Sequence, residues 1–518
     1  MTTTIHAAES IDNDADNDAD NDAATTTDVV IVGAGPVGMT LATELALAGV
    51  QVVILETTPH RIGQEKARGV GTLAAEALRR RGLSTRLWMP LAPGAGAPPI
   101  PFRPHFAWIP KLDFGSRSEP GRNPAPIAQP ELEALLSEQV DALGIPVYRG
   151  HTVDELSTGD DSVCTSAHTP QGRRTFRSRY VVGCDGGRSA VRTLGRFDFP
   201  GVPPTSVGRI GRLKVEDITT FPADVDGPRG SFTANVVDGW VYVRAFEPVA
   251  EDERGTSSPV SVEEMQAAIR RITGADVAIA TLDGPRRGYD HARQATTYRS
   301  GRVFLAGDAA HVHSPIGGQG LNLGLMDAVN LGWKLAAAVR GAVNAEDLLD
   351  SYTRERHPVG AGTLRNILAQ SALLDFTPHA RAIRQIVDEL LDIDEVKVYF
   401  SEMMSGTTIR YQLPHPTGNH PLLGGHIGDC VVDDTTLYSL MTDGRPLLIH
   451  HISAAEAAAV AQPWTDRVHI HRAVNLSGPA ISAALIRPDG VVVWAAEPRT
   501  RPDAAALVSA LETWFGPA

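Results

Sequence analysis

The 518-residue sequence predicts an α/β protein with a Rossmann-like domain, an antiparallel sheet inserted into it, and a separate small α/β domain at the C-terminal end. Three observations predict this class. Near residue 30 a β-branched run leads through a glycine-rich turn into a helical segment. From about 205 to 280, apolar and polar residues alternate. From about 410 to 518, the chain has strand and helix signals of its own.

Residues 1–27 are acidic and of low complexity, with Asp at every second position from Asp12 to Asp22. Such a segment cannot offset its ordering entropy by burial, so we expect a disordered tail. A calcium loop is the alternative, but the mid-loop glycine and terminal glutamate are missing at the required spacing. The whole chain has a formal net charge of -14, and seven acidic residues of the tail account for half of it, which leaves about -7 for the rest of the chain. That ordinary charge makes nucleic acid an unexpected partner.

The cysteine pattern indicates neither a disulfide-stabilised fold nor a metal-bound one. Cys164, Cys184 and Cys430 are far apart and form no C-x-x-C pair, so we expect neither disulfides nor a metal site. No run approaches the roughly 18 to 20 apolar residues that a membrane span needs. The N-terminus also lacks the basic and apolar regions of a secretory signal. We expect a soluble, cytoplasmic monomer or homodimer with no membrane partner.

Residues 28–56 form a complete β-α-β unit. Residues 28–32 read as a buried parallel strand, 40–48 as a helix stopped by Gly49, and 51–56 as a second strand. The first turn is a G-x-G-x-x-G made of Gly33, Gly35, Pro36, Val37 and Gly38. Its glycines permit a tight turn, a close approach to a pyrophosphate and close helix packing. The turn therefore predicts a dinucleotide site at the helix N-terminus.

Glu56 ends the second strand, where it is placed to accept hydrogen bonds from an adenosine ribose. These features alone do not distinguish NAD from FAD. The distinction comes from a second strand-to-helix junction, where the strand 302–306 leads into Gly307 and Asp308, and a glycine-rich run leads into a long helix over 321–339. Two such junctions suit a two-ended ligand, with one helix terminus for the pyrophosphate and another for a flavin ring.

The middle of the chain predicts a covering domain. Residues 90–126 are rich in Pro and Gly and read as a long loop; a helix begins near Pro130, and 181–185 reads as a buried strand. In the alternating region, Trp240, Tyr242 and Arg244 share one face of a strand and are candidates for contact with a substrate. Ordinary strand packing is the alternative for these three residues. Further polar or aromatic candidates without an assigned role are His105, Trp108 and His291.

Three motifs together resemble the class A flavoprotein monooxygenases, the family of para-hydroxybenzoate hydroxylase, phenol hydroxylase and the aromatic polyketide hydroxylases. They are the G-x-G-x-x-G, the Asp-Gly motif at 183–192, and the Gly-Asp motif that starts at Gly307. The resemblance covers about 28–400. It implies a discontinuous FAD-binding domain over 28–200 and 285–400, and a substrate-binding sheet domain over 201–284.

The resemblance also implies roles for individual residues. Asp308 would bind the ribityl or pyrophosphate part of FAD. The backbone N–H groups of Leu321 and Asn322 would face the pyrimidine edge of the flavin, and Pro315 would lie on its substrate side. Positions implied to contact FAD or the nicotinamide cofactor are Arg68, Gln129, Asp185, Gly186, Gly318 and Gly320. No catalytic residue follows from the motifs.

The segment 401–518 looks like the thioredoxin-like domain of phenol hydroxylase and many polyketide hydroxylases, because 485–490 followed by Trp494 is similar to its signature. Without C-x-x-C, thiol redox activity is not expected. The family's usual Gly-Arg-x-Pro-Asp-like segment is replaced here by 424–429, with His426 inside it.

By resemblance, the protein hydroxylates a phenolic or polyketide-like aromatic through a C4a-hydroperoxyflavin. FAD is then the bound cofactor, O2 a co-substrate and NADH or NADPH a transient reductant, since no second G-x-G-x-x-G is present. Alternatives are a Baeyer-Villiger oxygenase, a flavin-dependent halogenase and a ligand-sequestering protein. The halogenase motif W-x-W-x-I-P is absent: 106–110 has one tryptophan and lies too early.

Overall fold

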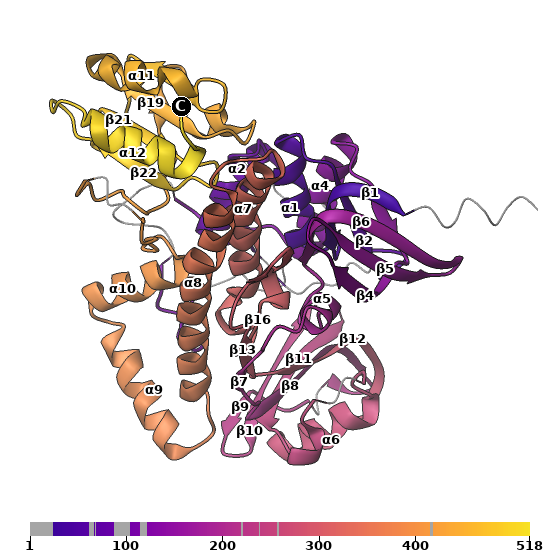
Figure 1. Ribbon diagram of the computed structural model, residues 1–518. Coiled ribbons are helices and arrows are strands. Elements are labelled where there is room, and N and C mark those ends of the chain that lie inside the picture. Colours follow the sequence, from indigo (N-terminus) through magenta and orange to yellow (C-terminus); the bar gives the residue numbers. More distant parts are fainter. Residues whose placement is uncertain are drawn as a thin grey trace, which may run out of the picture.

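The computed structural model describes residues 24–61, 67, 69–87, 104–113, 122–218, 221–237, 239–255, 258–414 and 418–518 (Figure 1). Of the predicted tail over 1–27, residues 1–23 lie outside the described residues, and so does Arg68. So does most of the predicted loop over 90–126, of which 104–113 and 122–126 are described.

The largest sheet in the described part of the chain has the order β14-β15-β6-β1-β2-β3, with β5 and β4 continuing from β6. Its strands β1, β2, β3, β15 and the last part of β6 run parallel. The strands are β1 (Thr25–Val32), β2 (Val52–Glu56), β3 (Val147–Arg149), β4 (Thr152–Thr158), β5 (Val163–Thr169), β6 (Gly172–Gly183), β14 (Arg299–Ser300) and β15 (Val303–Leu305).

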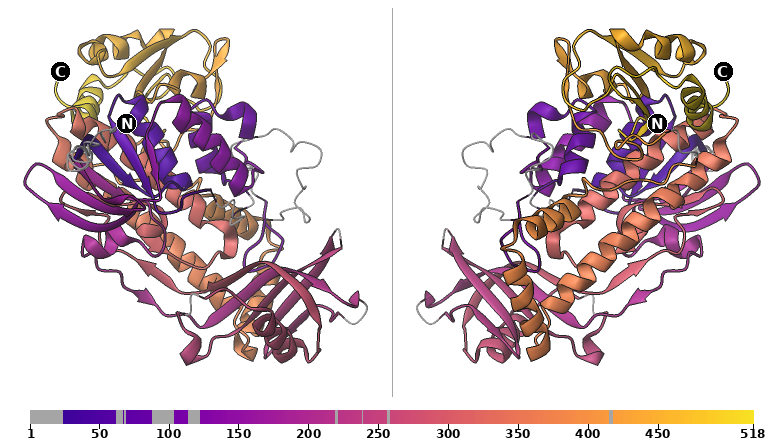
Figure 2. Two further views of the ribbon diagram at one scale, coloured as in Figure 1. Left: turned by 90° about the vertical axis from the view of Figure 1, so that its right-hand side faces the viewer. Right: turned by 90° about the vertical axis from the view of Figure 1, so that its left-hand side faces the viewer.

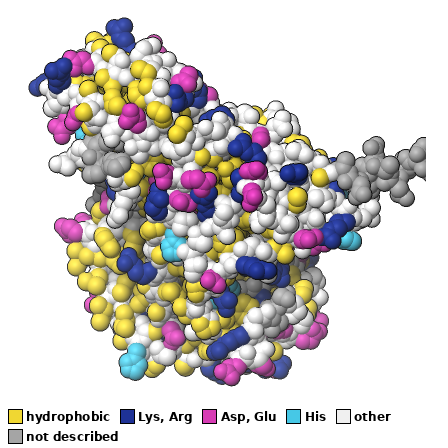
Figure 3. All heavy atoms as spheres, in the orientation of Figure 1, with side chains coloured by type: hydrophobic (Ala, Val, Ile, Leu, Met, Phe, Trp, Pro, Cys, Tyr) yellow, Lys and Arg dark blue, Asp and Glu magenta, His cyan; other side chains and the backbone are white. Residues whose placement is uncertain are grey.

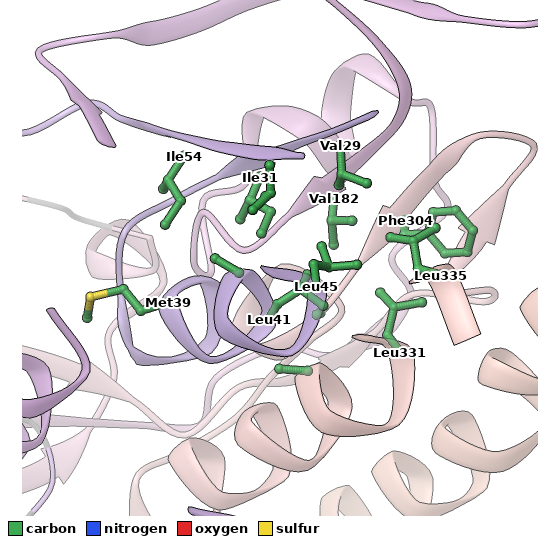
Figure 4. Packing of buried hydrophobic residues seen from close by; sticks show 14 of the residues in the cluster. Val29, Ile31, Met39, Leu41, Leu45, Ile54, Val182, Phe304, Leu331 and Leu335 are labelled. Atoms are coloured by element: carbon green, nitrogen blue, oxygen red, sulfur yellow. The ribbon is translucent and has the colours of Figure 1, made fainter. Parts of the chain in front are cut away.

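Helices α1 and α7 pack together against this sheet (Figure 4). Leu41 and Leu45 of α1 and Leu331 of α7 lie against Val29 and Val182 of the sheet, and all five are buried. The strands are near-continuous apolar runs because both faces of a parallel sheet are covered. The helices of this domain are α1 (Pro36–Leu47), α2 (Thr72–Arg79), α3 (Ser84–Leu87), α4 (Gln129–Ala142), α5 (Ala190–Leu194), α7 (Gly320–Val339) and α8 (Ala345–Leu373).

The predicted antiparallel sheet is present, with the order β12-β8-β11-β10-β9. Helix α6 (Val262–Thr273) covers one face, where it packs on alternate residues such as Phe232, Val241 and Val243. Its strands are β8 (Ser206–Val215), β9 (Val225–Gly227), β10 (Gly230–Val237), β11 (Trp240–Pro248) and β12 (Ile279–Tyr289). A small sheet of β7 (Gly201–Val202), β13 (Ala292–Gln294) and β16 (His311–Val312) joins it to the first domain.

The C-terminal domain lies at the opposite end of the molecule from the antiparallel sheet (Figure 2). Its mixed sheet has the order β20-β19-β21-β22, with β19 and β20 parallel and the other pairs antiparallel. Trp333 of α7 and Leu348 of α8 belong to its apolar core, so it is packed firmly on the first domain. Its elements are β17 (Val431–Val432), β18 (Thr435–Thr436), β19 (Leu447–His451), α11 (Ala455–Ala461), β20 (His469–Ala473), β21 (Ala483–Ile486), β22 (Val492–Ala496) and α12 (Ala504–Phe515).

Helices α9 (Pro378–Leu390) and α10 (Asp394–Ser405) lie in the chain between α8 and the C-terminal domain. Their inner side packs with the segment 104–113, where Phe106, Ile109 and Met404 are buried. Their outer side exposes apolar residues, which gather at the lower left of the molecule (Figure 3). Among the described helices, none combines the length and the apolarity that crossing a membrane would require.

Two boundaries differ from those expected. Strand β1 begins at Thr25 and not at residue 28, because Thr25, Thr26 and Thr27 pair with 176–178 of the long strand β6. The antiparallel sheet continues to Tyr289, beyond the expected limit at 284, because the end of β12 pairs with Val207 of β8.

Candidate functional site

The motifs of the sequence meet at one edge of the large sheet. Strands β15, β6, β1 and β2 are consecutive neighbours and parallel, and they end at Leu305, Gly183, Val32 and Glu56. The Gly-Asp turn, the Asp-Gly turn and the glycine turn therefore start side by side, although about 270 residues separate the first from the last. Ligands of open α/β sheets bind at this carboxyl edge.

The glycine turn is shaped by close backbone contacts. Gly33 has φ +108, and a Cβ there would lie 2.4 Å from the carbonyl oxygen of Cys184. A Cβ on Gly38 would lie 2.0 Å from the carbonyl oxygen of Gly33. Only glycine fits at these two positions, because any side chain would collide with backbone.

The N-terminus of α1 faces open space. No atom lies within 4 Å of where a Cβ on Gly35 would be, and Pro36 occupies the first helical turn. The backbone N–H groups of Val37 and Gly38 have no partner among the described residues. The turn therefore presents unpaired donors at the positive end of a helix, which suits a phosphate.

Glu56 fastens this turn. Its Oε2 accepts a hydrogen bond from the Ala34 N–H at 2.8 Å, and its Oε1 accepts from the Thr58 N–H and hydroxyl at 2.8 and 2.7 Å. Because a carboxylate has about four acceptor positions, Oε2 keeps capacity for a ribose hydroxyl. The bracing of the glycine turn was not predicted from sequence.

The Gly-Asp turn touches the glycine turn directly. Gly307 has φ +64, and a Cβ there would lie 3.0 Å from the Val37 side chain. A Cβ on Gly324 would lie 2.8 Å from the same Val37 methyl. Asp308 follows in the short helical turn Gly307–Ala309, and its carboxylate is exposed without a partner among the described residues. An anion in this position is available to bind hydroxyl groups of a ligand.

The N-terminus of α7 forms the second open helix end. The N–H groups of Leu321 and Asn322 have no partner in the described part of the chain, and a Cβ on Gly318 would meet nothing within 4 Å. The Asn322 side chain accepts from the Gly71 N–H at 2.6 Å and donates to the Gly318 carbonyl at 3.0 Å. The side chain of Pro315, just before this segment, is exposed.

In the Asp-Gly turn, the two carboxylate oxygen atoms of Asp185 have different surroundings. Its Oδ2 accepts from the Ala190 and Val191 N–H groups at the start of α5, at 2.7 and 3.1 Å. Its Oδ1 is buried without a partner among the described residues, and burial raises the pKa of the carboxyl. Gly186 follows with φ +78, which allows the chain to reverse there.

Arg192 joins the two turns, since it donates to the carbonyls of Gly187 at 2.8 Å and Ala309 at 2.9 Å. Arg192 belongs to the Asp-Gly motif, but the sequence alone predicted no role for it. Gln129, by contrast, is engaged inside α4: its side chain donates to Glu133 at 2.8 Å, and its N–H donates to the Ala67 carbonyl at 2.9 Å.

A buried charged group supports the Gly-Asp turn from behind. Asp327 of α7 accepts from the Gly307 N–H at 3.1 Å, from His311 Nε2 at 2.7 Å and from Arg356 Nε at 2.8 Å. Arg356 also donates to the Tyr411 hydroxyl at 2.9 Å. The charge of Arg356 lowers the pKa of Asp327 against the opposing effect of burial. Asp327 thereby holds the turn, α7 and α8 in one arrangement.

A second buried network joins α7 and α8 to the C-terminal domain. Glu355 accepts from Arg487 at 2.7 and 2.8 Å and from Lys334 at 2.8 Å, and Arg487 also pairs with Asp489. Asn330 donates to both Glu355 and Asp489. The polar residues of the predicted long helix thus serve domain docking, a role that sequence reasoning did not assign.

The sheet face opposite α6 carries the three substrate candidates. Trp240, Tyr242 and Arg244 alternate on β11 and are all partly exposed, as the period-two pattern predicted. The Trp240 ring lies near Arg212 and Lys214, at 5.2 and 4.9 Å, so it packs within its own sheet. The Arg244 guanidinium instead lies 5.8 Å from the ring of Trp108, which belongs to the segment 104–113.

His105 stacks on Trp108, with ring centroids 4.6 Å apart. Burial and the nearby charge of Arg244 lower the pKa of His105, so its ring is neutral at neutral pH. Burial and the charge of Arg293 also lower the pKa of His291, against the opposing effect of Asp290. The His291 ring lies 6.4 Å from that of Tyr289.

Together these residues fit FAD. Val37 and Gly38 can meet a pyrophosphate, Glu56 a ribose, Asp308 hydroxyl groups, and the α7 N-terminus the flavin ring. The open space at Gly35 and Gly318 and the unpaired helix N–H groups are the observations that this fit rests on.

Comparisons with known proteins show an FAD-binding domain in this chain. A family model described as FAD binding domain matches residues 26–367, and one described as aromatic-ring hydroxylase, C-terminal, matches 420–518. An anhydrotetracycline monooxygenase from Streptomyces rimosus is 37% identical over 515 residues, covering 95% of this chain and 99% of the relative. A rifampicin monooxygenase from Streptomyces venezuelae is 37% identical over 503 residues, with coverage of 95% and 99%. The solved OxyS anhydrotetracycline hydroxylase from Streptomyces rimosus superimposes with a TM-score of 0.85 at 35% identity, covering 95% of this chain and 100% of that one.

Proposed function

This chain belongs to the family of FAD-binding aromatic-ring hydroxylases, and we propose that it inserts one oxygen atom of O2 into a phenolic, fused-ring small molecule, with NADH or NADPH as electron donor. The enzyme class, an FAD-dependent aromatic monooxygenase, follows from membership. The ring system and the reductant are the proposed parts. Relatives named for anhydrotetracycline and rifampicin favour a multi-ring substrate of polyketide type.

One observation carries the proposal: two open helix N-termini and an exposed acid converge at one sheet edge, across which a two-ended cofactor can lie. We assign the pyrophosphate to the start of α1 and the ribityl chain to Asp308. Bound there, FAD supplies the redox and O2 chemistry of the reaction. The N–H groups of Leu321 and Asn322 would stabilise negative charge on a bound flavin, because they stand at the positive end of α7.

The substrate is assigned to the space between Pro315 and the open face of β11. Tyr242 and Arg244 supply polar contacts from the sheet, and the buried apolar residues beneath 104–113 exclude water from this side. We keep Trp240 as a contact at the margin, since its ring already packs with two cations of its own sheet.

NADH or NADPH is assigned a transient role. Among the described residues we find one glycine turn of the dinucleotide type, and we assign FAD to it. Arg68, Asp185 and Gly186 remain the proposed contacts of the nicotinamide cofactor. The rates of NADH oxidation and NADPH oxidation by the enzyme show which of the two reductants is preferred.

The test is turnover by the purified yellow protein. We expect that a fused-ring phenol accelerates NADH or NADPH oxidation, and that the product gains one atom of 18O from 18O2. NMR of the product then separates a ring hydroxyl from a Baeyer-Villiger ester. If no member of a panel of phenols and quinones accelerates cofactor oxidation, the proposed hydroxylase activity is wrong and a ligand-sequestering role gains support.

A further inference from the structure

The segment 104–113 contains a tight turn in an unusual backbone conformation. Phe106 and Ile109 exchange two backbone hydrogen bonds, at 3.1 and 2.8 Å, around Ala107 and Trp108. These central residues have φ +47 and +62. Two consecutive left-handed residues define a turn in which Asn-Gly is the favoured pair. An alanine and a tryptophan adopt this conformation at a cost, which the surrounding structure must offset.

Buried contacts hold the turn in place. The Ala107 N–H donates to Gln370 Oε1 at 3.0 Å, and Arg384 donates to the Ala107 carbonyl at 3.3 Å. Gln370 of α8 is fully buried, and its amide nitrogen would lie 3.1 Å from a Cβ on Gly317. The turn is therefore tied to the segment 315–318, which we assign to the flavin side of the site.

The strained turn presents one large side chain outward. Its flanking residues Phe106 and Ile109 are buried, whereas Trp108 is 42% exposed. His105 lies against the indole with an interplanar angle of 26°. Arg244 reaches the same indole from β11, so residues far apart in sequence form one group next to the proposed substrate space.

The chemistry of this group indicates what it binds. An indole face stacks on planar aromatic rings. A guanidinium has five donors in a fixed fork that matches anionic oxygen atoms, so it can bind an anionic oxygen while it keeps other contacts. A stacking surface beside a cation thus favours a flat ring that carries an ionised oxygen over its neutral counterpart.

We propose that Trp108, His105 and Arg244 form a specificity subsite that selects planar aromatic substrates carrying an ionised oxygen, a phenolate or enolate. This inference deepens the proposed function and rests on it for the position of the flavin. Trp108 and His105 provide the surface, and Arg244 pairs with the charged oxygen. The strained turn fixes the angle at which the indole meets the ring.

The test measures binding, without turnover, to the oxidised FAD-loaded enzyme. The probe is 2-hydroxy-1,4-naphthoquinone, a planar enol that is ionised at neutral pH, and its neutral counterpart is 2-methoxy-1,4-naphthoquinone. Perturbation of flavin absorbance reports each Kd. We expect the wild type to bind the anion at least about tenfold more tightly than the ether, a ratio that corresponds to about 1.4 kcal/mol.

Variants assign that preference to the subsite. Arg244→Met should reduce the ratio to below about threefold, and Arg244→Lys should leave an intermediate ratio, because a lysine keeps the charge but loses the fork. Trp108→Ala should weaken both probes, whereas Trp108→Phe retains most binding. Arg270→Met is the matched control: it removes one positive charge from α6, on the opposite side of the sheet, and should keep the full ratio. Flavin content verifies folding of each variant.

The subsite is refuted if the wild type binds neither probe, if it binds both equally, or if the full preference survives in Arg244→Met. Failure of the proposed function looks different. In that case the binding preference would persist, but no aromatic compound would stimulate cofactor oxidation or acquire 18O. Conversely, turnover without charge selection would support the function and remove the subsite.

Discussion

Replacing Asp327 with alanine removes the acceptor that holds the Gly-Asp turn. The Gly307 N–H, His311 Nε2 and Arg356 Nε all donate to this carboxylate, which is fully buried. Arg356 would keep Tyr411 and the Leu323 carbonyl as acceptors but lose its counter-charge. Breaking a buried ion pair from one side costs about 3–5 kcal/mol. For cooperative unfolding of a chain this long, the midpoint temperature should fall by about 3–5 °C.

The assay is calorimetry of the flavin-loaded protein, with bound FAD measured by absorbance. We expect both the lower midpoint and a reduced FAD content, because Asp327 positions the turn that carries Asp308. Adding Arg356→Met should cost less than the sum of the single changes, since the unpaired charge is then removed as well. Asp226→Ala, in an exposed pair with Arg381 at 3.3 Å, is the control and should shift the midpoint little. A shift below about 1 °C with full FAD content in Asp327→Ala would show that Asp327 does not hold the Gly-Asp turn.

Gly307→Ala should destabilise the protein by about 1–2 kcal/mol and weaken FAD binding, because φ is +64 at this position and the new methyl group meets the Val37 side chain. An unchanged Kd for FAD would contradict this prediction. Burial lowers the pKa of His426 to about 3, so as pH falls this histidine is protonated in the unfolded state before it is protonated in the folded state. The free energy of unfolding therefore decreases below pH 6.5, by about 1.4 kcal/mol per pH unit. The stability of wild type relative to that of His426→Leu should therefore fall between pH 7 and 5, and a constant difference would rule this out. Arg487→Met leaves Glu355 short of a partner at the domain junction, and should speed proteolysis between the first domain and the C-terminal domain; an unchanged cleavage rate would show that apolar packing alone docks the domain.

The sequence predicted the parts of the site that depend on local backbone form. A glycine directly after a buried strand indicates a tight turn at the end of that strand. Because parallel strands end at one edge of the sheet, the sequence could place Gly33, Gly307 and Glu56 close together. The start of β1 was missed because Thr25–Thr27 is polar, and only its pairing with β6 makes it a strand. Here tertiary contact overrides the local pattern.

The partners of buried charges could not be predicted. Asp327 binds Arg356 from another helix, and Arg356 binds Tyr411 from a later loop, so no spacing rule connects the three. The turn at Ala107 and Trp108 is a similar case, because neither residue favours a left-handed conformation. Its geometry becomes visible only when Gln370 is placed beneath it.

The FAD content of Asp308→Ala is the most direct test of the central claim, that FAD lies across the sheet edge between the two helix ends. Asp308 is exposed and has no partner among the described residues, so its loss should leave the fold intact. We predict that this variant binds FAD at least about tenfold more weakly than wild type, with unchanged circular dichroism. Glu389→Ala, an exposed acid on α9, should bind FAD normally. Wild-type affinity for FAD in Asp308→Ala would show that FAD does not lie against Asp308.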